Sequence, residues 1–268
     1  MELVRYRLIF DRKIMGKECA VLKNYIYQYI EKWKERLCNL EYEKPLSYRP
    51  AVIYKTSRRK EGTNAVKTLL LTGFEPFLNF TINPTMRIVE ELHGQEIGDY
   101  NIHSEVLPVD FRKSGKLLIQ HIEKIKPDAL ISLGLAGGRY KITPERIAIN
   151  VNDGESDNSG NALVDETIQD DGAEAYMSTL PIRAMVNRLL DEGLPAEISN
   201  TAGTYLCNHV MYQGLHYAKI HNQNLPSGFI HIPASHELAI QHGRIPSWSH
   251  EDLKRGIISC INVLSENS

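Results

Sequence analysis

The stretch "KTLLLTGF" (residues 67–74) is a short, almost continuous run of apolar residues that ends at a glycine and an aromatic residue. A second run of this kind, "DALISLG", follows at residues 128–134. Such runs are typical of parallel strands that are buried on both faces of a sheet. The two stretches therefore predict a parallel sheet that begins near residue 67.

Further strands and helices alternate along the rest of the chain. Strands are expected at residues 146–152, 196–203 and 228–233. Helical spacing of apolar residues is found near 84–94, 111–125, 180–192, 207–221 and 250–265. Alternation of strands and helices predicts an α/β fold. We expect a three-layer α/β/α arrangement with a mostly parallel twisted sheet, plus a helical N-terminal extension.

The first quarter of the chain differs in charge from the rest. Residues 1–66 hold 15 Lys and Arg against 8 Asp and Glu, whereas residues 67–268 hold 16 against 25. Apolar residues at helical spacing predict one amphipathic helix over 19–39, followed by a polar linker. We predict a basic extension over 1–66 and a main domain over 67–268. We expect the extension to dock on this domain or on a second subunit of a homo-oligomer, and not on nucleic acid or a membrane surface.

Several classes of protein are excluded by simpler observations. No run of about 18 apolar residues is present, so no membrane span is expected. The N-terminus is charged and does not resemble a secretory signal. The cysteines are far apart and suggest neither a zinc site nor a disulfide framework; they are Cys19, Cys38, Cys207 and Cys260. A reducing, cytoplasmic location is expected, with no metal and no organic cofactor.

Ligands of open α/β sheets bind beyond the carboxyl ends of the strands. This rule selects the segments "TGFEPF", "GLAGGR", "TAGTYLC" and "HIPAS". "GLAGGR" lacks the residues of a phosphate-binding loop, so it is a weak signal for phosphate. Phe74 and Phe77 follow the first strand, where they would wall an apolar ligand or pack onto the core.

Cys207 stands at the first turn of a predicted helix, on its apolar face. It is either a buried small hydrophobe or a nucleophile, because a helix N-terminus favours the thiolate. His209 is rotated by about 200° from Cys207 on the helix and is a poor candidate for the base. His231, near a strand end, is either a core histidine or the base. Glu145 is either exposed or the group that orients this histidine.

The segments "LLLTGFEPF", "GLAGGRYKITPERIAIN", "GTYLCNHVMY" and "GFIHIP" occur in an order that resembles the pyroglutamyl peptidase I family, from residue 67 to about 265. The resemblance implies a cysteine peptidase that removes N-terminal pyroglutamate from peptides through a thioester. It implies a triad of Glu145, Cys207 and His231. The residues it implies for substrate binding are Phe74, Phe77, Asn83, Leu135 and Tyr205.

Three departures from the family pattern affect these expectations. Leu135 stands where the family usually has Gln, and Tyr205 stands where Phe is common. After "AIN", an Arg-containing run is replaced by a segment with Gly154 and Glu155. If that Arg helps to hold the oxyanion, this chain must use backbone donors instead. The alternative is a catalytically weak homologue that still binds pyroglutamyl peptides.

Overall fold

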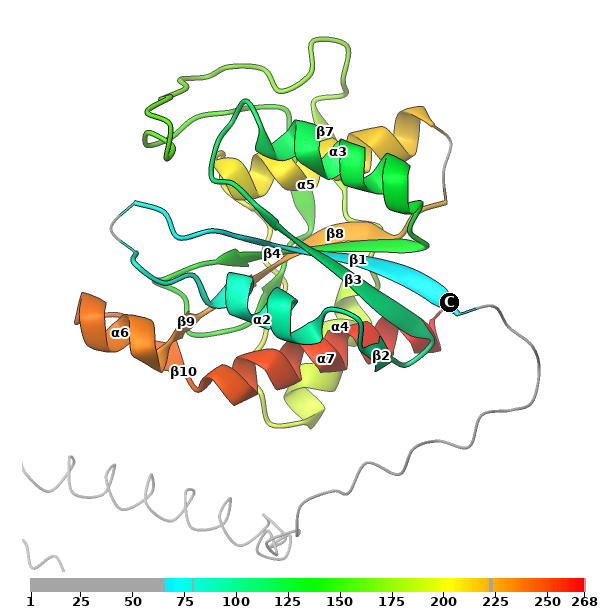
Figure 1. The fold of residues 1–268 in the computed structure, drawn as a ribbon, viewed down its shortest axis with the longest axis vertical. Helices are drawn as coiled ribbons and strands as arrows, with labels where there is room; N and C mark the ends of the chain where they lie inside the picture. The colour runs from blue at the N-terminus through cyan, green and yellow to red at the C-terminus, as the bar shows by residue number, and fades with distance from the viewer. Residues whose placement is uncertain (1–65, 79, 222–223, 268) are drawn as a thin grey trace, which may run out of the picture. The chain divides into compact units, whose positions relative to one another are not determined.

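The fold is organised around one six-stranded sheet (Figure 1). The computed structural model describes residues 66–78, 80–221 and 224–267. The strand order is β2–β3–β1–β4–β8–β5. These strands are β1 (Lys67–Phe74), β2 (Glu96–Ile97), β3 (Tyr100–Leu107), β4 (Ala129–Leu135), β5 (Thr143–Pro144) and β8 (Ser227–Ile232). The four central strands are parallel, whereas the two-residue strands β2 and β5 pair antiparallel at the edges.

The central strands are buried because helices cover both faces of the sheet. Every residue of β4 and β8 is buried, and so are the last six residues of β1. Apolar runs on these strands can contact both helical layers, so no polar alternation is needed. The prediction of buried parallel strands from residues 67–74 and 128–134 is confirmed.

Six helices are present in the described residues. They are α2 (Pro84–Leu92), α3 (Ser114–Ile125), α4 (Ile182–Asp191), α5 (Leu206–Ile220), α6 (His236–His242) and α7 (His250–Glu266). Figure 1 shows α3 and α5 on one face of the sheet and α2, α4 and α7 on the other. Each face has its own apolar cluster, to which successive residues of β1 contribute alternately: Leu70 to one, Leu69 and Leu71 to the other. The predicted α/β fold with a mostly parallel sheet is confirmed.

Two expected strands are wrong in extent or position. Of residues 146–152, only β6 (Ile147–Ile149) is a strand, and it pairs antiparallel with β7 (Ala175–Met177) outside the main sheet. Residues 196–203 form no strand; Ala196 and Ser199 make only isolated bridges. The second half of this stretch, "NTAG", bends toward α5 because its Gly203 has a φ of 79°.

Several elements were not predicted from the sequence, among them β3 and α6. Strand β3 carries polar residues on a partly exposed face near the sheet edge, which hides its strand pattern. Helix α6 spans only seven residues, too few for helical periodicity to emerge. Two further strands, β9 (Ala234–Ser235) and β10 (Ser247–Trp248), pair with each other beside it. The helix expected over 19–39 and the linker after it lie outside the described residues.

In the parts of the chain that the structure describes, no helix combines the length and the apolar character needed to cross a bilayer.

Candidate active site

A small pocket lies at the carboxyl ends of the parallel strands, where the sequence predicted it. Its lining residues are Phe74, Phe77, Asn83, Val109, Leu135, Tyr205, Leu206 and Cys207. The cavity among them has a volume of only about 10 Å³, far below the roughly 300–1,000 Å³ of usual ligand sites. Its lining is mostly apolar with one thiol. These side chains must therefore move apart before a ligand can lie next to the thiol.

The Cys207 thiol is held at the start of α5. The side chain of the N-cap residue, Tyr205, makes no hydrogen bond to the backbone N–H groups of the first turn. Those groups and the helix dipole favour negative charge at this end. The sulfur also lies close to the sheet: a Cβ atom at Gly134 would be 2.9 Å from Sγ. A glycine at the end of β4 is therefore needed for the sulfur to take this position.

His231 lies beside the same glycine, because Gly134 and His231 are register partners in β4 and β8. The imidazole is 5% exposed. Its Nδ1 is 2.7 Å from Oε1 of Glu145, so Nδ1–H donates to the carboxylate and Nε2 is left for the thiol. Burial lowers the pKa of His231, but the negative Cys207 thiolate and Glu145 outweigh it and raise this pKa to about 9.

Glu145 reaches His231 because of the antiparallel edge strand. Thr143 of β5 is the register partner of His231, and Glu145 directly follows β5. The Glu145 side chain is fully buried. Its Oε1 also accepts a bond of 2.7 Å from Nη1 of Arg139, whereas Oε2 has no partner. The structure thus brings together all three residues of the expected triad.

Arg139 was not among the predicted site residues, because "GLAGGR" was assessed as a phosphate-binding loop and gives a weak signal for one. The signal that could have found it is a cation at a strand end, six residues before the candidate carboxylate.

The neighbours of Cys207 on α5 have structural partners. Asn208 is fully buried. Its Oδ1 accepts a bond from the Ile149 backbone N–H, and its Nδ2 donates to the carbonyls of Ile149 and Val151. His209 Nδ1 lies 2.9 Å from Oδ1 of Asn152, and burial lowers the pKa of His209 to about 4. His209 therefore faces away from the pocket. Asn208 carried no signal in the sequence, because only the fold shows what it bonds.

Asn83 lines the pocket from the N-cap of α2. Its Oδ1 accepts bonds from the backbone N and the hydroxyl of Thr85, and its Nδ2 donates to the Glu75 carbonyl. With these polar atoms engaged, Asn83 braces the loop that carries Phe74 and Phe77.

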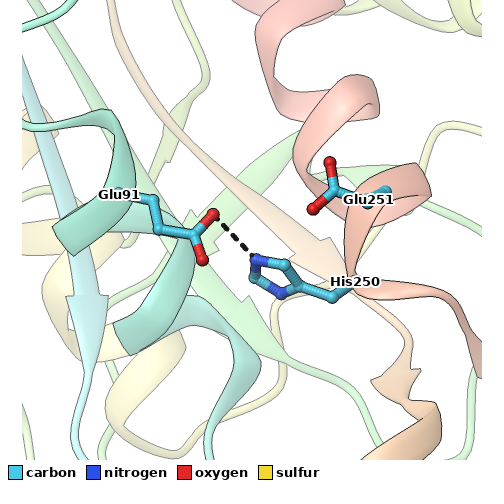
Figure 2. Close-up of side chains that lie close together, drawn as sticks. All are labelled: Glu91, His250 and Glu251. Carbon is cyan, nitrogen blue, oxygen red and sulfur yellow. Dashed lines mark hydrogen bonds and ion pairs between the residues drawn. The ribbon is translucent and has the colours of Figure 1, made fainter.

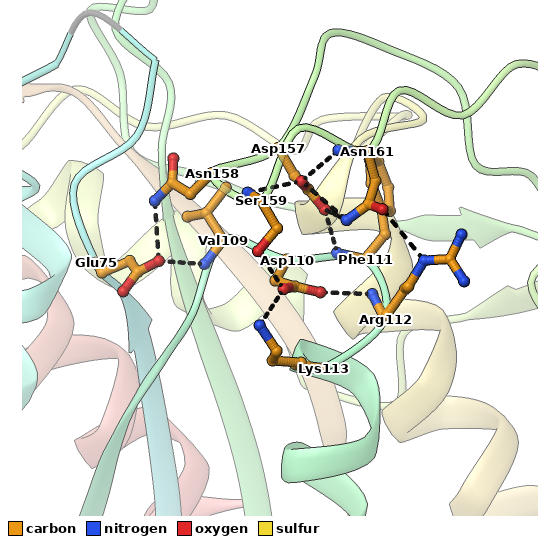
Figure 3. Close-up of polar contacts among 10 residues, drawn as sticks. All are labelled: Glu75, Val109, Asp110, Phe111, Arg112, Lys113, Asp157, Asn158, Ser159 and Asn161. Carbon is orange, nitrogen blue, oxygen red and sulfur yellow. Dashed lines mark hydrogen bonds and ion pairs between the residues drawn. The ribbon is translucent and has the colours of Figure 1, made fainter.

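Three buried or half-buried carboxylates join the loops around the pocket (Figure 3). Glu75 accepts bonds from the Val109 backbone and from Asn158. Asp157 accepts bonds from the Phe111 backbone and from Asn161, the latter through both backbone and side chain. Burial acts to raise the pKa of Asp157, but these hydrogen bonds lower it below its ordinary value. Asp110 similarly accepts from Lys113 and Ser159.

The segment that departs from the family pattern contacts the pocket wall through Tyr205. A Cβ at Gly154, where φ is 154°, would lie 3.0 Å from the Tyr205 ring. The Tyr205 hydroxyl donates to the carbonyl of Ser156 at 3.3 Å. Residues 153–161 thus hold one wall of the pocket instead of supplying an arginine.

One group of side chains in the described residues brings metal-binding atoms together away from the pocket (Figure 2). Glu91 on α2 lies close to His250 and Glu251 at the start of α7. However, Nζ of Lys254 donates to Glu91 at 2.9 Å and to Glu251 at 3.1 Å. Lys254 already supplies positive charge, so this group is an ion-pair network between two helices.

The family model for pyroglutamyl peptidase matches residues 67–267. The chain belongs to the pyroglutamyl peptidase family. Among its relatives, a pyrrolidone-carboxylate peptidase from Lysinibacillus sphaericus is 62% identical over 193 residues, covering 72% of this chain and 94% of the relative. One from Halalkalibacterium halodurans is 52% identical over 199 residues, covering 73% and 98%.

Solved structures agree with this membership of the pyroglutamyl peptidase family. A mutant pyrrolidone carboxyl peptidase from Pyrococcus furiosus matches with a TM-score of 0.73 and 43% identity, covering 75% of this chain and 99% of that one. The enzyme from Thermococcus litoralis matches with a TM-score of 0.72 and 40% identity, covering 75% and 94%. This pyroglutamyl peptidase is therefore a cysteine peptidase, as its sequence motifs predicted.

Proposed function

We propose that Cys207, His231 and Glu145 are the catalytic triad with which this pyroglutamyl peptidase removes N-terminal pyroglutamate from peptides. The observation that carries the proposal is a buried imidazole 2.7 Å from a buried carboxylate, next to a thiol at the edge of a small apolar pocket. A thiol, a base and a group that orients the base are the components that nucleophilic catalysis requires.

The reaction begins with the Cys207 thiolate and the His231 imidazolium. The thiolate attacks the carbonyl carbon that joins pyroglutamate to the next residue, and the carbonyl oxygen becomes an oxyanion. When the C–N bond breaks, the imidazolium gives its proton to the leaving amine, and a thioester remains. His231 then takes a proton from water, whose oxygen attacks the thioester. Free pyroglutamate leaves and the thiolate is regenerated.

Glu145 accepts a hydrogen bond from the imidazole through both steps. It fixes the orientation of the imidazole through Nδ1–H and stabilises its positive charge. The oxyanion would be held by the backbone N–H groups of the first turn of α5, which the N-cap side chain leaves free. Such backbone donors would replace the arginine that this chain lacks.

The apolar walls of the pocket fit a lactam ring. Phe74, Phe77 and Tyr205 offer aromatic faces, and Leu135 offers an aliphatic surface. Since these side chains leave little space beside Cys207, the terminal residue of a peptide would reach the thiol more readily than the middle of a chain. Peptides with N-terminal pyroglutamate are therefore the proposed substrates.

A chromogenic pyroglutamyl amide tests this function directly. We expect release of the chromophore by the wild type, and its loss after treatment with iodoacetamide and in Cys207→Ala. A wild type that binds the amide without cleaving it would support the alternative of a weak homologue. A Cys207→Ala variant that keeps more than about a tenth of wild-type kcat would contradict the thiol mechanism. A cytoplasmic location and a homo-oligomer stay predictions.

A further inference from the structure

Arg139 contacts three separate segments around the proposed triad. It follows β4 in a turn closed by a bond from its own backbone N–H to the Ala136 carbonyl. Its Nη1 donates to Oε1 of Glu145 and to Oγ1 of Thr143, both at 2.7 Å. Its Nη2 donates to the carbonyl of Thr201 at 3.3 Å. The guanidinium thereby links the edge strand β5, the carboxylate after it and the loop that leads into α5.

The charge of Glu145 needs a constant partner. A fully buried carboxylate is costly to ionise unless a positive charge lies beside it. The His231 imidazolium is such a charge, but the proposed reaction requires His231 to give up its proton and take one back in every cycle. Arginine stays protonated throughout the accessible pH range. Oε1 of Glu145 accepts bonds from both cations, at 2.7 Å each.

No other cation is bonded to this carboxylate among the described residues. Arg146 is the next residue in the chain, yet its Nε bonds Oδ1 of Asn200 at 2.7 Å. The other titratable group facing His231 is the Cys207 thiol. Arg139 is thus the single permanent positive charge in direct contact with the Glu145 carboxylate.

We infer that Arg139 is a positioning residue of this enzyme: it is the permanent counter-ion of Glu145 and it fixes that carboxylate to the loop that precedes Cys207. The inference rests on the proposed triad. Arg139 is 34% exposed at its side chain, so it lies at the border of the site and touches the reacting atoms only through Glu145.

A lysine can replace only part of this role. The ammonium of Lys carries the charge, but it is a point donor on a flexible stem, whereas the planar guanidinium reaches two acceptors in fixed directions. Arg139→Lys should keep Glu145 ionised and loosen the link to Thr201. Arg139→Met and Arg139→Gln remove the charge, and Gln retains hydrogen-bond donors.

The test measures the rate of Cys207 alkylation by iodoacetamide against pH, followed on the Cys207 peptide by mass spectrometry. Removing a nearby positive charge makes the cluster bind protons more tightly. The acid-side midpoint should move to higher pH, by roughly one unit, in Arg139→Met and Arg139→Gln. It should stay near the wild-type position in Arg139→Lys and in the control Arg146→Met. For the amide substrate, kcat should fall roughly tenfold or more in the neutral variants, with little change in KM.

A merely structural role predicts a different result. If the midpoints of both neutral variants moved no further than that of Arg146→Met, the inference would be wrong, whatever the loss of activity. If the neutral variants did not fold, Arg139→Lys would decide, because a shifted midpoint in a variant that keeps the charge also contradicts the inference. Alkylation needs no substrate, so this outcome is independent of the amide assay that tests the proposed function.

Discussion

At the residue scale, the position of the Cys207 sulfur depends on Gly134, which has no side chain. Gly134 lies under Cys207 at the end of β4, and a Cβ there would be 2.6 Å from the Phe229 ring and 2.9 Å from Sγ. Contacts this short require the ring or the sulfur to move. A displacement of the reacting atom by about 1 Å can cost two orders of magnitude in rate.

Gly134→Ala should therefore lose roughly tenfold or more in kcat/KM while the protein stays folded. Gly138→Ala is a matched control four residues on, where a Cβ meets nothing within 4 Å. Steady-state kinetics with a pyroglutamyl amide and circular dichroism would check both variants. Equal activity of the two would mean that the sulfur does not need the space above Gly134.

The pKa of His231 is a second property that depends on single residues. Its pKa is raised to about 9 chiefly by the Cys207 thiolate, acting against burial. Cys207→Ala removes that charge, so the pKa of His231 should fall well below 9. In the wild type, kcat/KM should decline as pH rises through about 9, because the imidazolium that protonates the leaving amine is lost.

Nuclear magnetic resonance of the imidazole protons measures this pKa in each variant. Cys260→Ala is the control, since Cys260 is buried in the apolar cluster on the other face of the sheet. An unchanged His231 pKa in Cys207→Ala would show that the thiol is protonated in the resting enzyme.

At the element scale, three successive residues in the first turn of α5 point in different directions and have different partners. Cys207 faces the pocket, Asn208 bonds the backbone around β6, and His209 packs against Asn152. The pKa of His209 is lowered to about 4 by burial, against an ordinary value of 6.5. Between about pH 4 and pH 6.5, the unfolded chain therefore binds a proton at His209 that the folded protein does not bind.

Stability should fall as pH drops from about 6.5 to 4, and His209 should contribute to this fall. His209→Gln removes the titrating group. The free energy of unfolding of the variant should decrease less between pH 7 and pH 5 than that of the wild type, even if it is lower at pH 7. Urea unfolding at both pH values measures the difference. Parallel losses in the two proteins would contradict the assignment.

The elements also show which features the sequence could predict. Strands β1, β4 and β8 are buried on both faces, so their apolar runs were sufficient. Residues 196–203 resembled a strand in composition, but their backbone makes only isolated bridges and then bends into α5. The expected site residues could be found because they sit in recognisable motifs. Arg139 and Asn208 could not, because their partners are distant in sequence and only the folded chain brings them together.

At the scale of the whole molecule, the described elements form a complete sheet with helices on both faces. Lys67, the first residue of β1, donates its backbone N–H to the Asp99 carbonyl. Among the described residues, an apolar cluster lies on each face of the sheet. The proposed triad and the residues that line the pocket belong to the same part of the chain.

We predict that a chain lacking residues 1–66 folds and cleaves pyroglutamyl amides at a rate close to that of the full chain. Far-UV circular dichroism, thermal melting and the amide assay would compare the two proteins, and size-exclusion chromatography would show whether the first 66 residues change the oligomeric state. An unfolded or inactive short chain would show that the predicted domain boundary is misplaced.

The small size of the pocket also limits which peptide bonds of surrounding proteins can reach Cys207. A thiol peptidase with an open cleft can cleave exposed loops of the proteins around it. Here, the cavity beside Cys207 is only about 10 Å³ and is walled by Phe74, Phe77 and Tyr205. The middle of a polypeptide does not fit in it. The shape of the site therefore restricts cleavage to chain ends and protects internal peptide bonds, including those of the enzyme itself.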